Sequence, residues 1–166
     1  MKYYLIAGEA SGDLHASNLI KALKKEQPAA EFRCWGGDLM AAQGAEVVKH
    51  YRDLAFMGFA EVLMNLRTIL GNLKKAKQDI LAYQPEVLIL IDYPGFNMRI
   101  AEFAKKKGIR VVYYISPQVW AWKENRVKKL RRDVEQMITI LPFEQEFYRQ
   151  HNMQVHYAGH PLLDAI

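Results

Sequence analysis

The stretch Val87-Leu88-Ile89-Leu90-Ile91 is an unbroken apolar run of five residues. Runs of this length and character are typical of a β-strand that is buried on both faces, as in a parallel sheet covered by helices. Pro85 precedes the run, and a loop at residues 92–97 follows it. We therefore interpret the run as a central strand of a parallel sheet.

Short apolar runs and longer amphipathic segments alternate on both sides of this strand. Further strands are expected at residues 3–7, 31–35, 46–50, 111–115, 136–141 and 155–158. Helices are expected at residues 13–27, 38–43, 57–83, 98–107, 123–132 and 143–151. This alternation predicts an α/β fold with a Rossmann-like, doubly wound, mostly parallel sheet. Ligands of such sheets bind beyond the carboxyl ends of the strands, so the loops there are the candidates for chemistry.

Composition excludes several classes of protein. With 166 residues, 51% hydrophobic and 25% charged, the chain suits one globular domain and neither a fibrous nor a disordered protein. Cys34 is the single cysteine, which excludes a disulfide framework and a cysteine-rich metal site. The net charge of +5 favours an anionic partner: a phosphate ligand, nucleic acid or an acidic membrane surface. No apolar run approaches the roughly 18 residues of a spanning helix, and no signal peptide is evident, so we expect a cytoplasmic protein.

The first loop contains Gly8, Glu9, Ser11, Gly12 and Asp13, between the first strand and the first helix. Backbone N–H groups at such a turn can bind an anion. The spacing matches neither a Walker loop, nor G-x-G-x-x-G, nor G-x-S-x-G. Two interpretations therefore remain open: a contact with a phosphate or sugar, or a plain turn in which Ser11 or Asp13 caps the helix.

Asp92 directly follows the central strand, at the edge of the sheet where ligands bind. A carboxylate held there on a rigid element is a candidate general base if burial raises its pKa. The alternative is a structural cap for the following helix. We interpret Asn97 as that N-cap, because it immediately precedes the helix expected from Met98, and this leaves Asp92 available for chemistry.

Aromatic and imidazole side chains occupy the remaining loops, and cations gather in the helix expected at residues 123–132. Trp120 and Trp122 follow the strand at residues 111–115; they either line a ligand pocket or form a small core under the next helix. His160 follows the last expected strand and is either a ligand contact or an ordinary turn residue. The cations at residues 126–132 form either a solvated helix face or a phosphate-binding surface.

The segment at residues 57–83 combines an apolar stripe at helical spacing with several cations. One interpretation is a helix that packs on the sheet. The bulk of its apolar side chains favours a second, in which a basic amphipathic helix lies on a membrane surface or contacts acyl chains. The residues expected at that contact are Phe59, Leu63, Met64, Leu66, Arg67 and Leu70.

Six stretches, weak singly, are specific together. They are Ala7-Gly8-Glu9-Ala10-Ser11-Gly12-Asp13, Met57-Gly58 with Glu61-Val62, Ile91-Asp92 with Pro94, Phe96 and Asn97, Ser116-Pro117 with Val119-Trp120-Ala121-Trp122, Leu141-Pro142-Phe143-Glu144, and Gly159-His160. In content and order they resemble the lipid-A-disaccharide synthases, glycosyltransferases of Gram-negative bacteria. The resemblance implies that residues 1–166 are the acceptor-side, N-terminal half of a two-domain GT-B enzyme. The UDP-sugar-binding C-terminal domain would then be absent from this chain.

The resemblance also implies a reaction. In this family a sugar is transferred, with inversion, from UDP-2,3-diacylglucosamine to 2,3-diacylglucosamine 1-phosphate (lipid X), which yields lipid A disaccharide 1-phosphate and UDP. Such a transfer needs a base for the acceptor hydroxyl, and Asp92 matches the family motif. The residues expected to contact the substrates are Gly8, Glu9, Ser11, Gly12, Asp13, Asn97, Ser116, Trp120, Trp122 and His160.

Enzymes of the GT-B arrangement need no bound metal, so we expect neither a metal nor another cofactor. The expected partners are the two lipid substrates and the inner-membrane surface, with peripheral attachment and a homodimer as a potential assembly. A generic nucleotide-binding Rossmann module is the alternative, and tight binding of UDP by this chain alone would favour it. We expect no nucleic-acid partner; a steeply salt-dependent affinity for RNA or DNA would argue otherwise.

Overall fold

The computed structural model describes residues 1–54, 66–115, 125–139, 142–150, 153 and 156–157. Within these residues, seven strands form one sheet in the order β3-β2-β1-β4-β5-β6-β7, and every neighbouring pair is parallel. The strands are β1 (Lys2–Ala7), β2 (Glu31–Gly36), β3 (Glu46–His50), β4 (Val87–Ile91), β5 (Arg110–Tyr114), β6 (Gln136–Thr139) and β7 (His156–Tyr157). The predicted doubly wound parallel sheet is confirmed.

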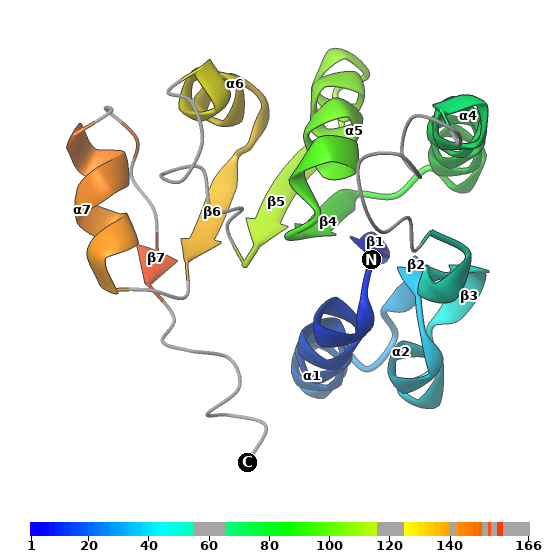
Figure 1. Cartoon of the computed structure of the whole chain (residues 1–166). Helices are drawn as coiled ribbons and strands as arrows, with labels where there is room; N and C mark the ends of the chain where they lie inside the picture. The colour runs from blue at the N-terminus through cyan, green and yellow to red at the C-terminus, as the bar shows by residue number, and fades with distance from the viewer. Residues whose placement is uncertain (55–65, 116–124, 140–141, 151–152, 154–155, 158–166) are drawn as a thin grey trace.

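Helices cover both faces of this sheet (Figure 1). One face carries α1 (Ala10–Glu26) and α2 (Asp38–Ala42), and the other carries α4 (Leu66–Tyr83), α5 (Pro94–Lys106) and α6 (Asn125–Asp133). A 3-10 helix, η1 (Tyr51–Leu54), follows β3, and α7 (Pro142–Gln150) lies beside β6 and β7. Strand order reverses between β1 and β4, which is where doubly wound sheets open a ligand-binding crevice.

All five residues of β4 are buried, as its apolar run predicted. Leu88 and Leu90 belong to the core between the sheet and α4, α5 and α6. Val87, Ile89 and Ile91 belong to the core on the α1 side. Because a strand alternates its side chains between faces, one apolar run supplies both cores, with roughly 1.5–3 kcal/mol from each fully buried side chain.

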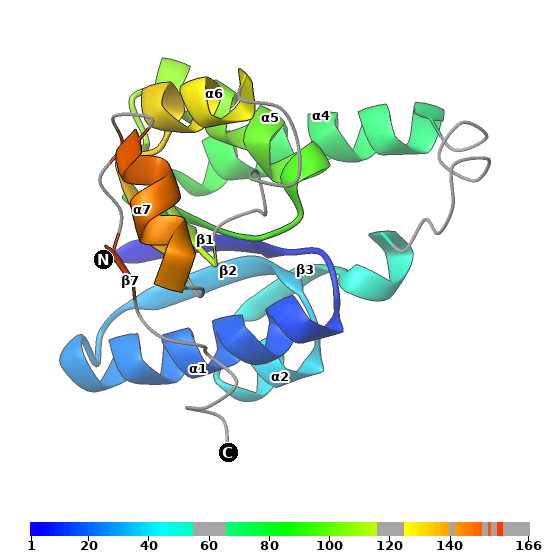
Figure 2. The same ribbon diagram turned by 60° about the vertical axis from the view of Figure 1, so that its left-hand side comes forward.

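The C-terminal half of α4 is fastened to the sheet by an ion pair. The Asp79 carboxylate accepts hydrogen bonds from Arg33 Nε at 2.8 Å and Nη2 at 2.6 Å, and from the Tyr4 hydroxyl at 2.6 Å. The Arg33 guanidinium holds the pKa of Asp79 below its usual value. The first turns of α4 instead project past the carboxyl end of β1 (Figure 2), and there Leu66 and Leu70 are 49% and 51% exposed.

Two helices begin well before the predicted residues, 13 and 98. Helix α1 starts at Ala10, with Glu9 at the N-cap position, so of the two open interpretations of the first loop, the one in which Ser11 or Asp13 caps this helix is wrong. Helix α5 starts at Pro94 with Tyr93 at the N-cap position, so Asn97 is not the N-cap either. The proline ring fixes φ near the helical value, which suits the first helical position. In the described part of the chain, no helix is both long and apolar enough to cross a membrane.

Candidate functional site

The loops after β1 and β4 lie side by side at the carboxyl edge of the sheet. The two strands are paired in register up to Ala7 and Ile91, so the loops leave the sheet at the same level. A Cβ atom placed on Gly8 would lie 2.5 Å from Cγ of Tyr93, closer than van der Waals contact allows. Only glycine at this position lets the Tyr93 ring lie across the first loop, next to Asp92.

The backbone of Asp92 is held in an unusual conformation. Its φ angle is +44°, and that of Tyr93 is +53°, both in the left-handed region that non-glycine residues seldom adopt. The Asp92 N–H donates to the Ile115 carbonyl at 3.1 Å. The Asp92 carbonyl accepts hydrogen bonds from Asn97 Nδ2 at 3.0 Å and from the Tyr113 hydroxyl at 2.5 Å. These contacts fix where the carboxylate points, and strain of this kind clusters at functional sites.

Asn97 is the centre of this arrangement and has no exposed surface. Its Nδ2 also lies 3.3 Å from the carbonyl oxygens of Ile6 and Ile91, at the ends of β1 and β4. One buried amide therefore joins two strands and the first turn of α5. In this conformation Asn97 acts on the site through the position of Asp92, and its direct contact with substrate stays a prediction.

The half-buried Asp92 carboxyl has a pKa raised to about 6, chiefly by burial and further by the negative charge of Glu9, while a hydrogen bond from the Tyr93 backbone opposes the shift. Burial and Glu9 also raise the pKa of the Tyr93 hydroxyl. Near neutral pH most Asp92 is ionised, yet it is more basic than an exposed aspartate. That combination suits a general base.

Asp13 is used inside the fold. It is 2% exposed, and its Oδ1 accepts from the N–H groups of Gly37 and Met40 at 3.0 Å each, while Oδ2 accepts from Leu39 N–H at 3.1 Å. The carboxylate on α1 therefore caps α2, a neighbouring helix. Gly37 occupies the N-cap position of α2 and offers no side-chain oxygen, which is the sequence signal that an external cap is needed.

The other predicted residues of the first loop divide into enclosed and accessible ones. Gly12 is buried, and a Cβ there would lie 3.2 Å from the Ala7 Cβ, so the glycine allows α1 to approach the sheet closely. Glu9 and Ser11 are exposed at the start of α1. Of the predicted site residues that the structure describes, Glu9, Ser11 and Asp92 keep their side chains accessible at this edge.

Several predicted residues lie outside the described part of the chain. Among the expected substrate contacts these are Ser116, Trp120, Trp122 and His160, and among the expected membrane contacts they are Phe59, Leu63 and Met64. The described membrane candidates Leu66, Arg67 and Leu70 are all exposed, and they share the projecting end of α4. Their exposure agrees with a surface role for this end of the helix.

An apolar pocket of about 360 Å³ is lined by Tyr93, the residue that follows Asp92. It lies between η1 and the first turns of α4 and α5, and its walls are Leu54, Leu66, Ile69, Tyr93, Pro94, Gly95, Phe96 and Arg99. Tyr93 reaches across it and donates a hydrogen bond from its hydroxyl to the Leu54 carbonyl at 3.4 Å. Sequence reasoning missed this pocket because three separate segments supply its walls.

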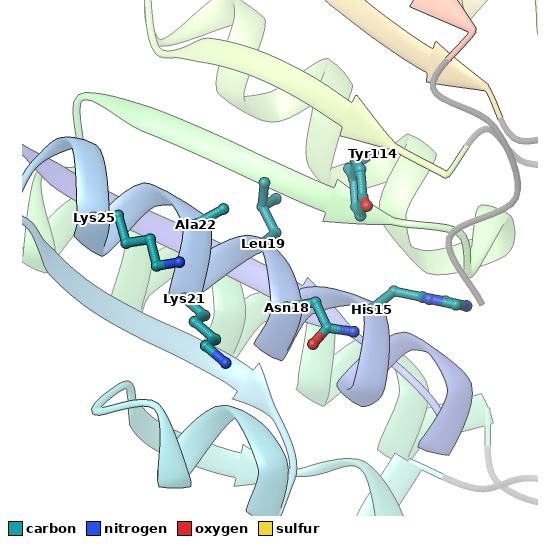
Figure 3. Close-up of a pocket in the computed structure, with 7 residues that line it drawn as sticks. All are labelled: His15, Asn18, Leu19, Lys21, Ala22, Lys25 and Tyr114. Atoms are coloured by element: carbon teal, nitrogen blue, oxygen red, sulfur yellow. The ribbon is translucent and has the colours of Figure 1, made fainter. Parts of the chain in front are cut away.

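A second pocket, of about 340 Å³, runs along α1 beside the end of β5 (Figure 3). Its walls are His15, Asn18, Leu19, Lys21, Ala22, Lys25 and Tyr114. No carboxylate lines it, so we place the candidate catalytic site at Asp92. Among the described residues, no group of three or more His, Cys, Asp or Glu side chains is arranged to hold a metal ion.

Solved structures of low sequence identity share this fold. The UDP-GlcNAc 2-epimerase of Neisseria meningitidis, solved with UDP-GlcNAc bound, superposes with a TM-score of 0.69 at 10% identity over 99% of this chain and 47% of that one. The corresponding enzyme of Methanocaldococcus jannaschii gives 0.71 at 13% identity, over 99% of this chain and 48% of its own. The fold defines the chain as a Rossmann-like domain of the GT-B class.

Sequence comparison gives the family. The profile described as lipid-A-disaccharide synthetase matches residues 3–166. The lipid-A-disaccharide synthases of Trichlorobacter lovleyi and Geobacter metallireducens are 45% and 46% identical to this chain over 162 residues. The matched region is 98% of this chain and 42% of each relative. The chain belongs to the lipid-A-disaccharide synthase family of glycosyltransferases, which confirms the resemblance, and it spans less than half the length of these relatives.

Proposed function

We propose that the protein containing this chain transfers a diacylglucosamine unit from UDP-2,3-diacylglucosamine to lipid X and releases UDP. Family membership supports the reaction type, and one structural observation carries the assignment to this domain. That observation is Asp92, a carboxylate of raised pKa fixed at the end of a buried strand, with the next residue, Tyr93, lining an apolar pocket. The pairing of a base with an apolar pocket suits an acceptor that is both a sugar and a lipid.

In the proposed reaction Asp92 takes the proton from the 6-hydroxyl of the acceptor. The hydroxyl oxygen then forms a bond to C1 of the donor sugar from the face opposite UDP. The bond between C1 and the phosphate oxygen breaks, UDP leaves with the electron pair, and the configuration at C1 inverts. Asp92 gives its proton to solvent before the next cycle. General-base assistance of this kind typically contributes about 10²- to 10⁴-fold to the rate.

The apolar pocket beside Asp92 would hold part of an acyl chain of the acceptor. Moving such a chain out of water gains roughly 0.8 kcal/mol for each buried CH₂ group. The exposed Leu66, Arg67 and Leu70 at the projecting end of α4 would meet the bilayer from which the acceptor comes. We therefore infer peripheral attachment to the cytoplasmic face of the inner membrane.

Residues 1–166 form the acceptor side of the enzyme in this proposal. The curated relatives are more than twice as long as the matched region, since 162 matched residues make up 42% of them. We expect the remaining part of the longer protein to make most of the contacts with the UDP of the donor. Glu9 and Ser11, exposed beside Asp92, are proposed as contacts to the sugars or phosphates in the cleft between the two parts.

The pH dependence of transfer tests this proposal. Only the ionised form of Asp92 accepts a proton, and its pKa is raised to about 6. In the full-length protein, kcat/KM should therefore rise about tenfold per pH unit below 6 and level off above it. Product formation from the two purified lipid substrates, measured between pH 4.5 and 8.5, checks this. Absence of transfer by the full-length protein would contradict the proposed function, and a profile without an inflection near 6 would contradict the role of Asp92.

Vesicle binding tests the membrane surface. Changing both Leu66 and Leu70 to serine should weaken binding of the chain to anionic vesicles by roughly tenfold to a hundredfold, because two half-exposed apolar side chains no longer insert. Leu81→Ser is the matched control, since Leu81 is 44% exposed at the other end of the same helix. Co-sedimentation at low salt measures both. An equal loss for the control, or none for the double variant, would show that the docking surface lies elsewhere.

A further inference from the structure

A polar hollow lies directly beside the apolar pocket. It has a volume of about 160 Å³, and its walls are Pro94, Gly95, Met98, Arg99, Glu102 and Lys129. Pro94, Gly95 and Arg99 also line the apolar pocket. The first turns of α5 therefore separate an apolar cavity from a polar one, and Arg99 belongs to both.

The polar hollow carries an excess of positive charge. Its one carboxylate, Glu102, already lies 3.3 Å from Lys106 Nζ and 3.8 Å from Arg132 Nη2. Within the part of the chain that the structure describes, Arg99 and Lys129 make no ion pair. Both are exposed and come from different helices, so among the described residues two cations line a cavity whose single carboxylate is already paired.

A ligand that fills both cavities must be an amphiphile with an anionic group close to its apolar part. The guanidinium of Arg99 can donate two parallel hydrogen bonds to a phosphate, and Lys129 can add a second positive charge. The two cavities share Pro94, Gly95 and Arg99 as walls, so a ligand that reaches both must pass over the first turns of α5. Asp92 lies two residues before this turn, so such a ligand would lie next to the proposed base.

We propose that Arg99 and Lys129 bind the phosphate of the acylated sugar acceptor while one of its acyl chains occupies the apolar pocket. This inference rests on the proposed function and adds to it a source of specificity. The two cations make the site select a phosphorylated acceptor over the same lipid without its phosphate. Solvent screens the contacts of both exposed cations with the phosphate. We therefore expect each cation to contribute no more than about a tenfold preference for the phosphorylated acceptor.

The test uses the 166-residue chain and two probes in micelles of a neutral detergent. The probes are 2,3-diacylglucosamine 1-phosphate and the same lipid without its phosphate. We expect the wild type to bind the phosphorylated probe at least tenfold more tightly. Arg99→Gln and Lys129→Gln should each reduce that preference by about five- to tenfold and leave binding of the other probe unchanged. Lys128→Gln, an exposed neighbour on α6, is the matched control and should keep the full preference.

Each other outcome contradicts the inference. Equal binding of the two probes by the wild type, or binding of neither, would show that no phosphate site exists here. An equal loss in Lys128→Gln would reduce the effect to general charge attraction. If Arg99→Gln instead weakens binding to phosphatidylglycerol vesicles that lack the sugar lipid, the cations recognise lipid headgroups and not the acceptor. The proposed function fails separately, through absence of transfer by the full-length protein.

Discussion

Replacement of Asp92 by asparagine is expected to slow glycosyl transfer by roughly 10²- to 10⁴-fold, because the amide cannot take a proton from the acceptor hydroxyl. Binding of both substrates should stay close to that of the wild type. The fold should also be kept, since Asn97, Tyr113 and Ile115 bond only to the main chain of residue 92. Asparagine also tolerates the left-handed backbone found there, which alanine does not.

The stability of this variant provides an independent check on the environment of Asp92. The pKa of Asp92 is about 6 in the folded state and about 4 in the unfolded state. Ionisation of this carboxyl therefore favours unfolding, and its contribution to stability falls as the pH rises from about 4 to about 6. Asparagine carries no charge, so at pH 7 the thermal midpoint of Asp92→Asn should equal or exceed that of the wild type. Calorimetry measures the midpoint.

A matched control is Asp53→Asn, which changes an exposed carboxylate in η1 and should leave turnover unaltered. If Asp92→Asn retains near wild-type turnover, Asp92 is not the base. If the variant loses both turnover and several degrees of thermal midpoint, the loss of turnover reports damage to the fold, and the raised pKa of the half-buried Asp92 carboxyl is wrong.

The sheet could be predicted because its signals are local. The apolar run of β4 must be covered on both faces, and all five residues are buried as expected. Each strand but the last is followed by a segment with helical spacing, which restricts the connections to parallel crossovers. The position of Asp92 at the ligand edge follows from the same pattern, so the sequence alone predicts where the central residue of the candidate site lies.

The starts of the helices were predicted less well because capping residues also serve other purposes. Asn97 has the chemistry of an N-cap, but its amide is used by carbonyl groups of β1, β4 and Asp92, and the contact with Ile6 spans 91 positions of the chain. No local pattern reports such a contact. Pro94 was the better signal, since proline favours the first position of a helix.

The pockets depend on segments that meet only after folding. The hollow that contains Arg99 also needs Lys129, from a helix that begins more than two dozen positions further along the chain. In the sequence, both residues look like ordinary solvated cations. The raised pKa of Asp92 has the same origin, because it results from burial against the first loop and from the charge of Glu9.

Asp13 is the clearest case in which the structure changes the meaning of a predicted residue, and its removal should have a large effect on stability. Asp13→Ala would leave the N–H groups of Gly37, Leu39 and Met40 without their acceptor, and Gly37 and Met40 are buried. We expect the free energy of unfolding to fall by about 3 kcal/mol, which corresponds to a thermal midpoint lower by roughly 6–12 °C for a domain of this size.

Two further variants separate this capping role from the predicted contact with substrate. Asp13→Asn keeps one side-chain oxygen as an acceptor, so it should lose less stability than Asp13→Ala. The part that is lost comes from Leu39 N–H, because the amide nitrogen cannot accept a hydrogen bond from it. Asp38→Ala removes a carboxylate whose side chain is 83% exposed in the first turn of α2, and it should cost less than about 1 kcal/mol. Urea denaturation ranks the three. If Asp13→Ala is as stable as the wild type but the full-length protein loses affinity for its substrates, the cap is dispensable and Asp13 belongs to the binding site after all.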